Sequence, residues 1–350
     1  MVMDAYRAAI IGCGRPGQGG FGIAYAHARA YTACPRTTLV AAADINAENL
    51  QAFCTTYNVR GYTDYRTLLE RERPDIVSIC TWPPLHAQMT VEAAEAGVRA
   101  IWCEKPMALS LAEADQMLAA CAAHGAKLQI NHQRRFAPAF QAARELIQSG
   151  RLGTLVRLEG YVPEWDLLSW GTHWIDMMRF WNDDRPVAWV IAQVDCRKRT
   201  RRYGHLVEDY AVTYFAFENG VRGFLEVGEG CTETVGLRIL GTEGMAVIQG
   251  GALRARPQGV GEWIEIAAAG SGEQAFLRAL EDLIASLEEG REPLLSGYSA
   301  RATTEIIMAA YESAYWRERV TLPLEVRDFP LSRLVQAQDS SPNRPSDRQV

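Results

Sequence analysis

A short apolar run that ends in a cluster of glycines most constrains the fold of this chain. Ala8 to Ile11 lead directly into Gly12-Cys13-Gly14-Arg15-Pro16-Gly17. Similar apolar runs recur with amphipathic stretches between them, at Thr38 to Ala43, Asp75 to Cys80, Arg99 to Cys103 and Lys127 to Ile130. Strands that alternate with helices in this way predict βαβ units and a doubly wound parallel sheet.

After Gly150 the pattern changes to longer strands of alternating polarity, expected at Leu155 to Val162, Val187 to Val194, Tyr210 to Phe217 and Val221 to Val227. Such alternation is typical of antiparallel sheet. Helices are expected near His173 and, closing this second domain, at Glu273 to Leu287 and Ser299 to Trp316. The predicted fold class is α/β plus α+β. The parallel-sheet domain spans residues 1–131, an open, mostly antiparallel sheet domain spans 132–327, and 328–350 form a polar, mobile tail.

Composition excludes several classes of function. The 350 residues carry 36 Lys and Arg against 42 Asp and Glu, a net charge of −6, so the chain lacks the basic excess of a nucleic-acid binder. Eight cysteines without a C-x-x-C pair argue against a disulfide framework and against a metal site, and suit a reducing cytoplasm. No apolar run is long enough for a membrane span, and no secretory signal is recognised.

The glycine loop predicts a dinucleotide site. Gly12, Gly14 and Gly17 fit the G-x-G-x-x-G fingerprint, in which residues without side chains let the backbone approach a pyrophosphate. Asp44 ends the second strand, where a carboxylate accepts hydrogen bonds from ribose hydroxyls and repels a 2′-phosphate, favouring NAD over NADP. The alternative is an ordinary flexible loop between a strand and a helix.

The spacing of this fingerprint is unusual, because Asp44 lies 32 residues after Gly12 where about 20 are expected. We interpret Arg15 to Gly22 as an insertion in the phosphate loop. The third small position is then filled by Gly17 or by a later residue such as Ala24.

Further motifs occur in a fixed order: His27, Thr81-Trp82-Pro83 with His86, Glu104-Lys105-Pro106, Asn131-His132 followed by Arg134-Arg135-Phe136, Gly171-Thr172-His173 with Asp176, and Glu312-Ser313. With the glycine loop, this arrangement over residues 8 to about 324 resembles the Gfo/Idh/MocA oxidoreductases, which include proteins similar to glucose-fructose oxidoreductase and inositol dehydrogenase. The resemblance implies a Rossmann domain followed by an open sheet. It also implies NAD bound near Thr81, Pro83, His86 and Glu104, and homodimers or homotetramers formed through the sheet.

Lys105 and His173 are the predicted catalytic pair. Lys105 follows a parallel strand at the edge where α/β sheets place ligands, so its ammonium can donate to a substrate oxygen. A solvated lysine is the alternative, and the resemblance favours catalysis.

We expect Thr172 to cap a helix on which His173, as general base, and Asp176 share one face. The alternative for His173 is a helix-start histidine that satisfies a buried polar group. Asp176 is expected to contact a substrate hydroxyl or to orient His173.

One position departs from the family pattern. Dehydrogenases that this chain resembles usually carry an aspartate four residues before the histidine, where this chain has Ser169. A serine cannot orient a charged imidazole as a carboxylate does, although Asp166 or Glu164 could substitute. Trp165 and Trp170 flank this loop and are expected, with Asp166, to contact the sugar, or else to pack beneath the loop.

Arg197-Lys198-Arg199 and Arg201-Arg202 place five positive charges in six positions. We interpret this basic run as a solvated face, with an acidic substrate or a neighbouring subunit as alternatives. His205, Glu208 and Asp209 receive no role.

These features together predict an NAD-dependent dehydrogenase that acts on a ring carbinol of a sugar, sugar derivative or cyclitol. The alternatives are an NAD-dependent glycosidase of the same family and an NAD-sensing regulator that performs no chemistry.

Overall fold

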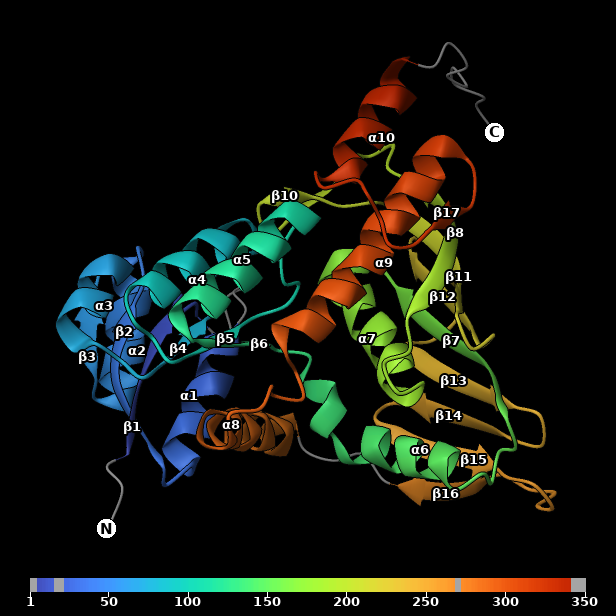
Figure 1. Cartoon of the computed structure of the whole chain (residues 1–350), viewed down its shortest axis with the longest axis horizontal. Helices are drawn as coiled ribbons and strands as arrows, with labels where there is room; N and C mark the ends of the chain where they lie inside the picture. Colours follow the sequence, from blue (N-terminus) through green and yellow to red (C-terminus); the bar gives the residue numbers. More distant parts are fainter. Residues whose placement is uncertain (1–4, 16–21, 268–271, 341–350) are drawn as a thin grey trace.

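The computed structural model describes residues 5–15, 22–267 and 272–340 (Figure 1). Gly17 therefore lies outside the described residues. The first sheet contains six parallel strands in the order β3-β2-β1-β4-β5-β6. Five of them were predicted, and the short β3 was not. The strands are β1 (Tyr6–Ile11), β2 (Thr37–Ala43), β3 (Arg60–Tyr62), β4 (Ile76–Ile79), β5 (Ala100–Cys103) and β6 (Lys127–Ile130). Because the order reverses between β1 and β4, a crevice opens at the carboxyl ends of these strands.

Two apolar layers cover this sheet. One face packs against α3 (Tyr65–Glu72), α4 (His86–Glu95) and α5 (Leu111–His124). The other packs against α1 (Ile23–Ala33), α2 (Ala47–Tyr57) and α8 (Gly272–Glu289). The sequence placed α8 in the second domain, but its apolar face is buried against the first sheet, where Phe276 lies 5.9 Å from the ring of Trp102.

The second sheet contains nine strands in the order β16-β15-β14-β13-β7-β12-β11-β8-β17. Only β7 and β12 pair in parallel among these strands of the described chain. The strands are β7 (Leu155–Pro163), β8 (Val187–Asp195), β11 (Tyr210–Phe217), β12 (Arg222–Gly228), β13 (Gly236–Gly241), β14 (Met245–Gln249), β15 (Ala252–Arg256), β16 (Ile264–Ala267) and β17 (Val320–Thr321). The predicted mixed architecture of a parallel and a mostly antiparallel sheet is confirmed.

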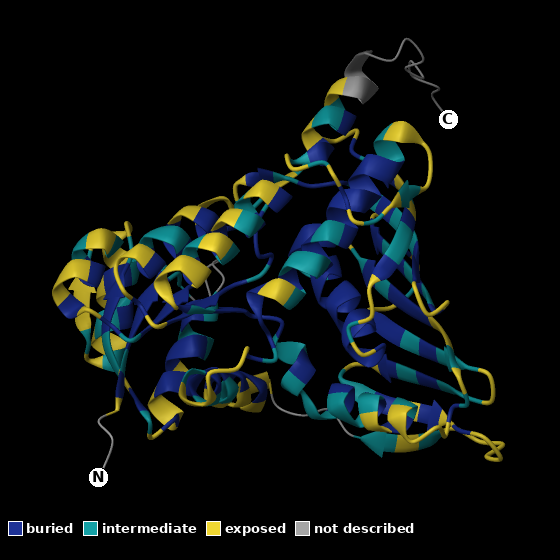
Figure 2. Cartoon of the chain, viewed as in Figure 1, coloured by how far each residue is buried: buried dark blue, intermediate teal, exposed yellow. Residues whose placement is uncertain are grey.

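One face of the second sheet is covered by α6 (Pro138–Gln148), α7 (Thr172–Trp181) and α9 (Gly297–Trp316), and the apolar core of this half is buried between the sheet and these helices (Figures 1 and 2). The last helix, α10 (Pro330–Ser340), packs against α9. The prediction of a mobile tail from residue 328 is wrong for residues 330–340. Leu331 and Leu334 of α10 are buried against the core around α9, and this apolar burial orders the segment.

Candidate active site

The glycine loop after β1 approaches the end of β4 very closely. A Cβ atom on Gly12 would lie 2.8 Å from Thr81 Cγ2 and 2.9 Å from the Thr81 backbone nitrogen, and Gly12 has a φ of +89°. Only glycine fits this position. Ala24 is buried in α1 against β1, as a small residue in the third fingerprint position would be. Gly12 therefore packs the loop directly against the end of β4, where any side chain would clash.

Asp44 lies directly after β2 and is joined to this loop. Its Oδ2 accepts hydrogen bonds from the backbone N–H groups of Cys13 (2.8 Å) and Gly14 (3.2 Å), and its Oδ1 accepts from Asn46 N (2.8 Å). The structure thus brings Gly12, Gly14 and Asp44 together at one end of the sheet. A negative charge here fits a ribose diol and disfavours a 2′-phosphate.

Glu104, at the end of β5, is enclosed by polar partners. Its Oε1 contacts His27 Nε2 at 2.9 Å and accepts from Asn131 Nδ2 at 2.5 Å. Burial alone raises the pKa of a carboxyl, but the hydrogen bond and charge of His27, with the nearby Lys105 and Asn131, hold the pKa of Glu104 below its usual value. Glu104 is thus a buried anion that supports the start of the Lys105 loop.

His86 connects two other loops of this edge. Its Nδ1 lies 2.9 Å from the carbonyl of Pro106, and its Nε2 lies 3.1 Å from the carbonyl of Thr81. Burial lowers the pKa of His86, so the neutral ring donates to one of these carbonyls at a time. The ring holds the loop after β4, which includes Pro83, against the segment that carries Lys105.

Lys105 reaches from the first domain into the second. Its Nζ donates to the backbone carbonyl of Ser169 at 2.8 Å. Ser169 lies in a single π-helical turn, Leu167–Gly171, which directly precedes α7. Such turns expose backbone groups that a regular helix would pair. A main-chain carbonyl therefore positions the ammonium group.

Two buried carboxylates hold this turn. Asp166 Oδ1 accepts from Ser169 N (2.7 Å), and Glu208 Oε1 accepts from Leu167 N (2.6 Å). Asp166 is 1% exposed, and its Oδ2 lies 3.3 Å from Arg202. The structure therefore places Asp166 beneath the turn, where it positions the backbone, and not on an open surface that a sugar could reach. Burial raises the pKa of Glu208 to about 7, with the charge of Asp166 adding to the effect.

His173 lies in the first turn of α7 and faces a cationic group of side chains. Burial lowers its pKa well below the usual value, and the charges of Lys105, Arg134 and His132 lower it further. The ring is therefore neutral near pH 7 and able to accept a proton. Its Nδ1 is buried without a partner among the described residues, whereas Nε2 is not among the buried unpartnered atoms.

The predicted Thr172 cap is wrong. Gly171 takes the N-cap position without a side-chain hydrogen bond, and Thr172 Oγ1 instead lies 2.9 Å from His132 Nε2. The π-helical turn continues directly into α7, so no extended residue precedes the helix to cap it.

Asp176 is engaged by Arg135. Arg135 Nε and Nη2 donate to the two oxygens of Asp176 at 2.9 and 2.8 Å, a bidentate pair in which both side chains are buried. His132 lies between Asp176 and His173, with its Nδ1 3.6 Å from Asp176 Oδ1 and its ring 5.8 Å from that of His173. This geometry makes Asp176 a positioning residue for η2 (Gln133–Phe136) and His132.

The aromatic residues of this turn line the same region. Trp165 and Trp170 lie 5.6 Å apart, and the ring of Trp170 meets that of His173 edge-on at 6.3 Å. Ser169 Oγ, Trp170 Nε1, His173 Nδ1 and Arg134 Nε are buried without a hydrogen-bond partner among the described residues. Unpaired polar atoms gathered at one turn are costly unless a ligand or water meets them.

The basic run is mostly neutralised. Arg197 pairs with Asp195 and Lys198 with Glu229, and Arg202 lies 4.2 Å over the ring of Trp165 as well as beside Asp166. The side chains of Arg197 and Lys198 are thus neutralised by ion pairs. Of the three basic residues, Arg202 is the one that reaches the wall of the site.

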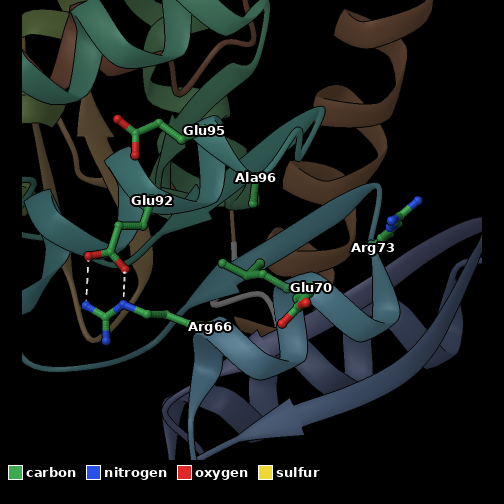
Figure 3. A pocket seen from close by; sticks show the side chains of 7 residues that line it. Arg66, Glu70, Arg73, Glu92, Glu95 and Ala96 are labelled. Atoms are coloured by element: carbon green, nitrogen blue, oxygen red, sulfur yellow. Dashed lines mark hydrogen bonds and ion pairs between the residues drawn. The ribbon is translucent and has the colours of Figure 1, made fainter.

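A separate cavity of about 580 Å³ lies between α3 and α4, lined by Arg66, Leu69, Glu70, Arg73, Glu92, Glu95 and Ala96 (Figure 3). Arg66 and Glu92, which line it, form an ion pair at 2.7 Å. None of the predicted site residues lines it.

No helix in the described part of the chain is long and apolar enough to cross a bilayer, and within those same residues no three His, Cys, Asp or Glu side chains form a metal-binding group.

Two sequence profiles of one family match the two halves of this molecule. The profile described as "Oxidoreductase family, NAD-binding Rossmann fold" matches residues 6–132, and "GFO/IDH/MocA C-terminal domain" matches residues 140–247. The chain belongs to the Gfo/Idh/MocA family. Its N-terminal sheet and helices are an NAD-binding Rossmann domain, and the glycine cradle and Asp44 described above fit that cofactor.

Relatives of this Gfo/Idh/MocA chain carry oxidoreductase names. It is 35% identical to "Uncharacterized oxidoreductase YrbE" of Bacillus subtilis, over 44% of each chain. It is 31% identical to a D-apiose dehydrogenase of Paraburkholderia graminis, over 63% of this chain and 60% of that protein. These matches therefore span about half the length of the curated relatives. A levoglucosan dehydrogenase solved with NADH and levoglucosan shares the fold, with a TM-score of 0.80 at 22% identity, over 92% of this chain and all of that one.

His132, Arg134 and Arg135 belong to the motifs of the family resemblance, which predicted no role for them. All three follow β6 at the same carboxyl edge as Lys105, and this position was the signal that could have found them. Glu208 carried no such signal, because its burial depends on contacts with Leu167 and Tyr311 that no spacing reveals.

Proposed function

We propose that this protein is an NAD-dependent dehydrogenase that transfers a hydride between a ring carbinol of a sugar, sugar derivative or cyclitol and nicotinamide. The observation that carries the proposal is the hydrogen bond of Lys105 to the turn that directly precedes the helix of His173. Lys105 donates to Ser169, four residues before His173, and its charge lowers the pKa of the imidazole. The reaction needs a neutral base and a cationic hydrogen-bond donor at the same carbinol, and we assign these roles to His173 and Lys105, which come from different domains.

The chemistry follows from the protonation states of these groups. In oxidation, NAD supplies the hydride acceptor. The neutral His173 takes the hydroxyl proton at Nε2, while the Lys105 ammonium stabilises negative charge on the same oxygen as the carbonyl forms. Hydride and proton leave the carbinol together, so the alcohol is oxidised by two electrons. Reduction runs through the same groups with His173 as acid.

The Gfo/Idh/MocA family and the sugar dehydrogenase names among the relatives support a sugar or polyol substrate. They do not favour the glycosidase alternative. The remaining alternative is an NAD sensor, and the presence of both Lys105 and His173 argues against it, since a sensor needs neither group.

The test is NADH formation by the purified protein on neutral and acidic sugars and cyclitols, followed by absorbance. We expect turnover with a subset, a loss of at least about 1,000-fold in Lys105→Met, and unchanged NADH binding. Lys127→Met, which changes an exposed-edge lysine paired with Glu292, is the matched control. Undiminished turnover in Lys105→Met would rule out this role. NADH binding without turnover of any member, together with a stable complex with a transcription factor, would favour the sensor.

We also propose a homodimer or homotetramer formed through the second sheet. The face opposite α7 and α9 carries a row of partly exposed apolar side chains, including Trp189, Ile191, Tyr214 and Phe224. Such a row is costly in water unless another subunit covers it. Light scattering after size exclusion should give a mass of more than one chain per particle. The substitution Ile191→Glu should shift the measured mass toward that of the monomer.

A further inference from the structure

Arg134 is a cation without a neutralising partner among the residues that the structure describes. It lies in η2, and its guanidinium carbon is 4.8 Å from the ring centroid of Trp174, 5.2 Å from that of Trp170 and 5.8 Å from that of Phe140. Among the described residues, no carboxylate lies within ion-pair distance of it and no hydrogen-bond acceptor meets its guanidinium. The neighbouring Arg135, by contrast, pairs with Asp176 and Asp184.

The enclosure of this guanidinium has an energetic cost. Its Nε is fully buried without an acceptor, and burial lowers the pKa of Arg134 to about 10, with no neighbouring carboxylate to oppose the effect. The group is nevertheless charged near pH 7. Aromatic faces recover only part of the lost hydration of a cation, so an anion is expected to complete the site.

Arg134 faces the same space as the reacting groups. Trp170, on which it lies, also meets the ring of His173, and the charge of Arg134 lowers the pKa of both His173 and Lys105. Its terminal nitrogens, unlike Nε, are not among the buried unpartnered atoms, which leaves them open to a ligand.

The carboxylates around this space are already engaged. Glu104 is held by His27 and Asn131, and Asp176 by Arg135. Asp166 holds Ser169 N and lies beside Arg202. With a serine at position 169, no carboxylate of the described chain beyond Glu104 and Asp166 offsets Lys105, and none offsets Arg134.

We propose that the substrate carries an oxyanion, which Arg134 binds in the same cavity as the carbinol that Lys105 and His173 act on. A planar guanidinium offers two parallel N–H groups to a carboxylate or a phosphate, so the recognised chemistry is that of a sugar acid or a sugar phosphate. The inference rests on the proposed function for the identity of the reacting groups, but the binding of the anion does not depend on turnover.

The experiment compares matched sugars. Wild-type protein with NAD is given D-glucose, D-glucuronate and D-glucose 6-phosphate, and the same trio built on galactose, with kcat/KM measured by NADH absorbance. Binding of each sugar to Lys105→Met with NADH is measured in parallel by saturation-transfer NMR. We expect an acid or phosphate to exceed its neutral partner in kcat/KM by at least about 100-fold, since a charged hydrogen bond contributes about that factor. The ratio of kcat/KM for the sugar acid to kcat/KM for the sugar phosphate shows whether the recognised oxyanion is a carboxylate or a phosphate.

Three variants assign the effect to Arg134. Arg134→Gln should lower kcat/KM for the anionic sugar by about 100-fold and for the neutral sugar by less than about threefold. Arg134→Lys should recover part of the loss, because it keeps the charge without the fork. Arg144→Gln is the matched control, since Arg144 also lies on a ring, that of Phe180, but is paired with Asp183. It should leave both values unchanged.

Failure of this proposal is distinct from failure of the proposed function. Turnover of neutral sugars with no anion preference, or an equal loss on both sugars in Arg134→Gln, would overturn the anion site and leave the dehydrogenase. Arginine-dependent binding of an anionic sugar without any turnover would support the anion site and contradict the dehydrogenase. Absence of both anion binding and anion preference in all six sugars would count against the anion site.

Discussion

The Lys105 ammonium donates to the main-chain carbonyl of Ser169 at 2.8 Å, which joins the end of β5 to the turn before α7. Related dehydrogenases usually carry an aspartate at the position of Ser169. In this chain the lysine is positioned by backbone, while Ser169 Oγ and His173 Nδ1 are both buried without a partner among the described residues. Lys105 is thus held by the backbone, and within the described residues no carboxylate meets the imidazole of His173 to stabilise its charged form.

The first prediction concerns the pH dependence of oxidation. Burial and nearby cations lower the pKa of His173, and burial lowers that of Lys105 despite Glu104 and Asp166. His173 therefore loses its proton at a pH well below 6.5, the usual pKa of a histidine. Lys105 loses its proton below 10.5, the usual pKa of a lysine. We expect kcat/KM for oxidation to stay flat from pH 8 down to about pH 6 and to fall on the alkaline side before pH 10.5. An acid limb centred above pH 6.5 would contradict the neutral imidazole.

Ser169→Asp is expected to move that acid limb. The new carboxylate lies in the turn beside His173 Nδ1 and favours the imidazolium, so it raises the pKa of His173. The acid limb of kcat/KM should then shift upward by about one pH unit or more. Ser149→Asp, on an exposed position after α6, adds the same charge far from the turn and serves as the control. No shift relative to this control would show that the side chain at 169 does not face the imidazole.

Much of the architecture was predictable because local patterns determine it. The β1 glycines, the strand ends and the position of Lys105 follow from polarity and from the rule that parallel strands present their carboxyl ends at one edge. The same holds for the start of α5, which Ser110 caps by accepting from Glu113 N through its Oγ. Each of these depends on residues close together in the chain.

The partners of the charged residues were not predictable from spacing. Asp176 lies on the expected helix, but Arg135, 41 residues earlier, takes both of its oxygens. Asp166 follows the same logic, because Arg202, a cation from another element, lies 3.3 Å from its Oδ2. Helical periodicity gives the face on which a side chain lies, but the competing cation comes from another element.

Removal of the charge from Asp176 is expected to destabilise the fold. Asp176→Asn leaves Arg135 without one of its buried anions, at a cost of about 3 kcal/mol or more in the free energy of unfolding. Asp183→Asn breaks the exposed ion pair with Arg144 and should cost less than about 1 kcal/mol, and asparagine tolerates the positive φ at that position. Urea unfolding at pH 7 measures both. Equal losses would mean that the Arg135 pair is not a stabilising element.

Glu208 is expected to make stability fall as the pH rises through neutrality. Burial raises its folded pKa to about 7, whereas the unfolded carboxyl titrates near 4.5. Between these values the unfolded chain has lost the proton that the folded protein keeps, so unfolding becomes easier with rising pH, by up to about 3 kcal/mol. Below pH 4.5 the contribution is fully present, and above pH 7 it is lost.

Glu208→Gln removes this titration. The amide oxygen can still accept from Leu167 N, as Glu208 Oε1 does at 2.6 Å. The free energy of unfolding, measured in urea from pH 5 to pH 8, should therefore fall more steeply for the wild type than for the variant. Glu218→Gln, an exposed glutamate beside a turn, should follow the wild type. If the two slopes were the same, Glu208 would be ionised throughout, and the turn that carries Ser169 would rest on two buried charges instead of one.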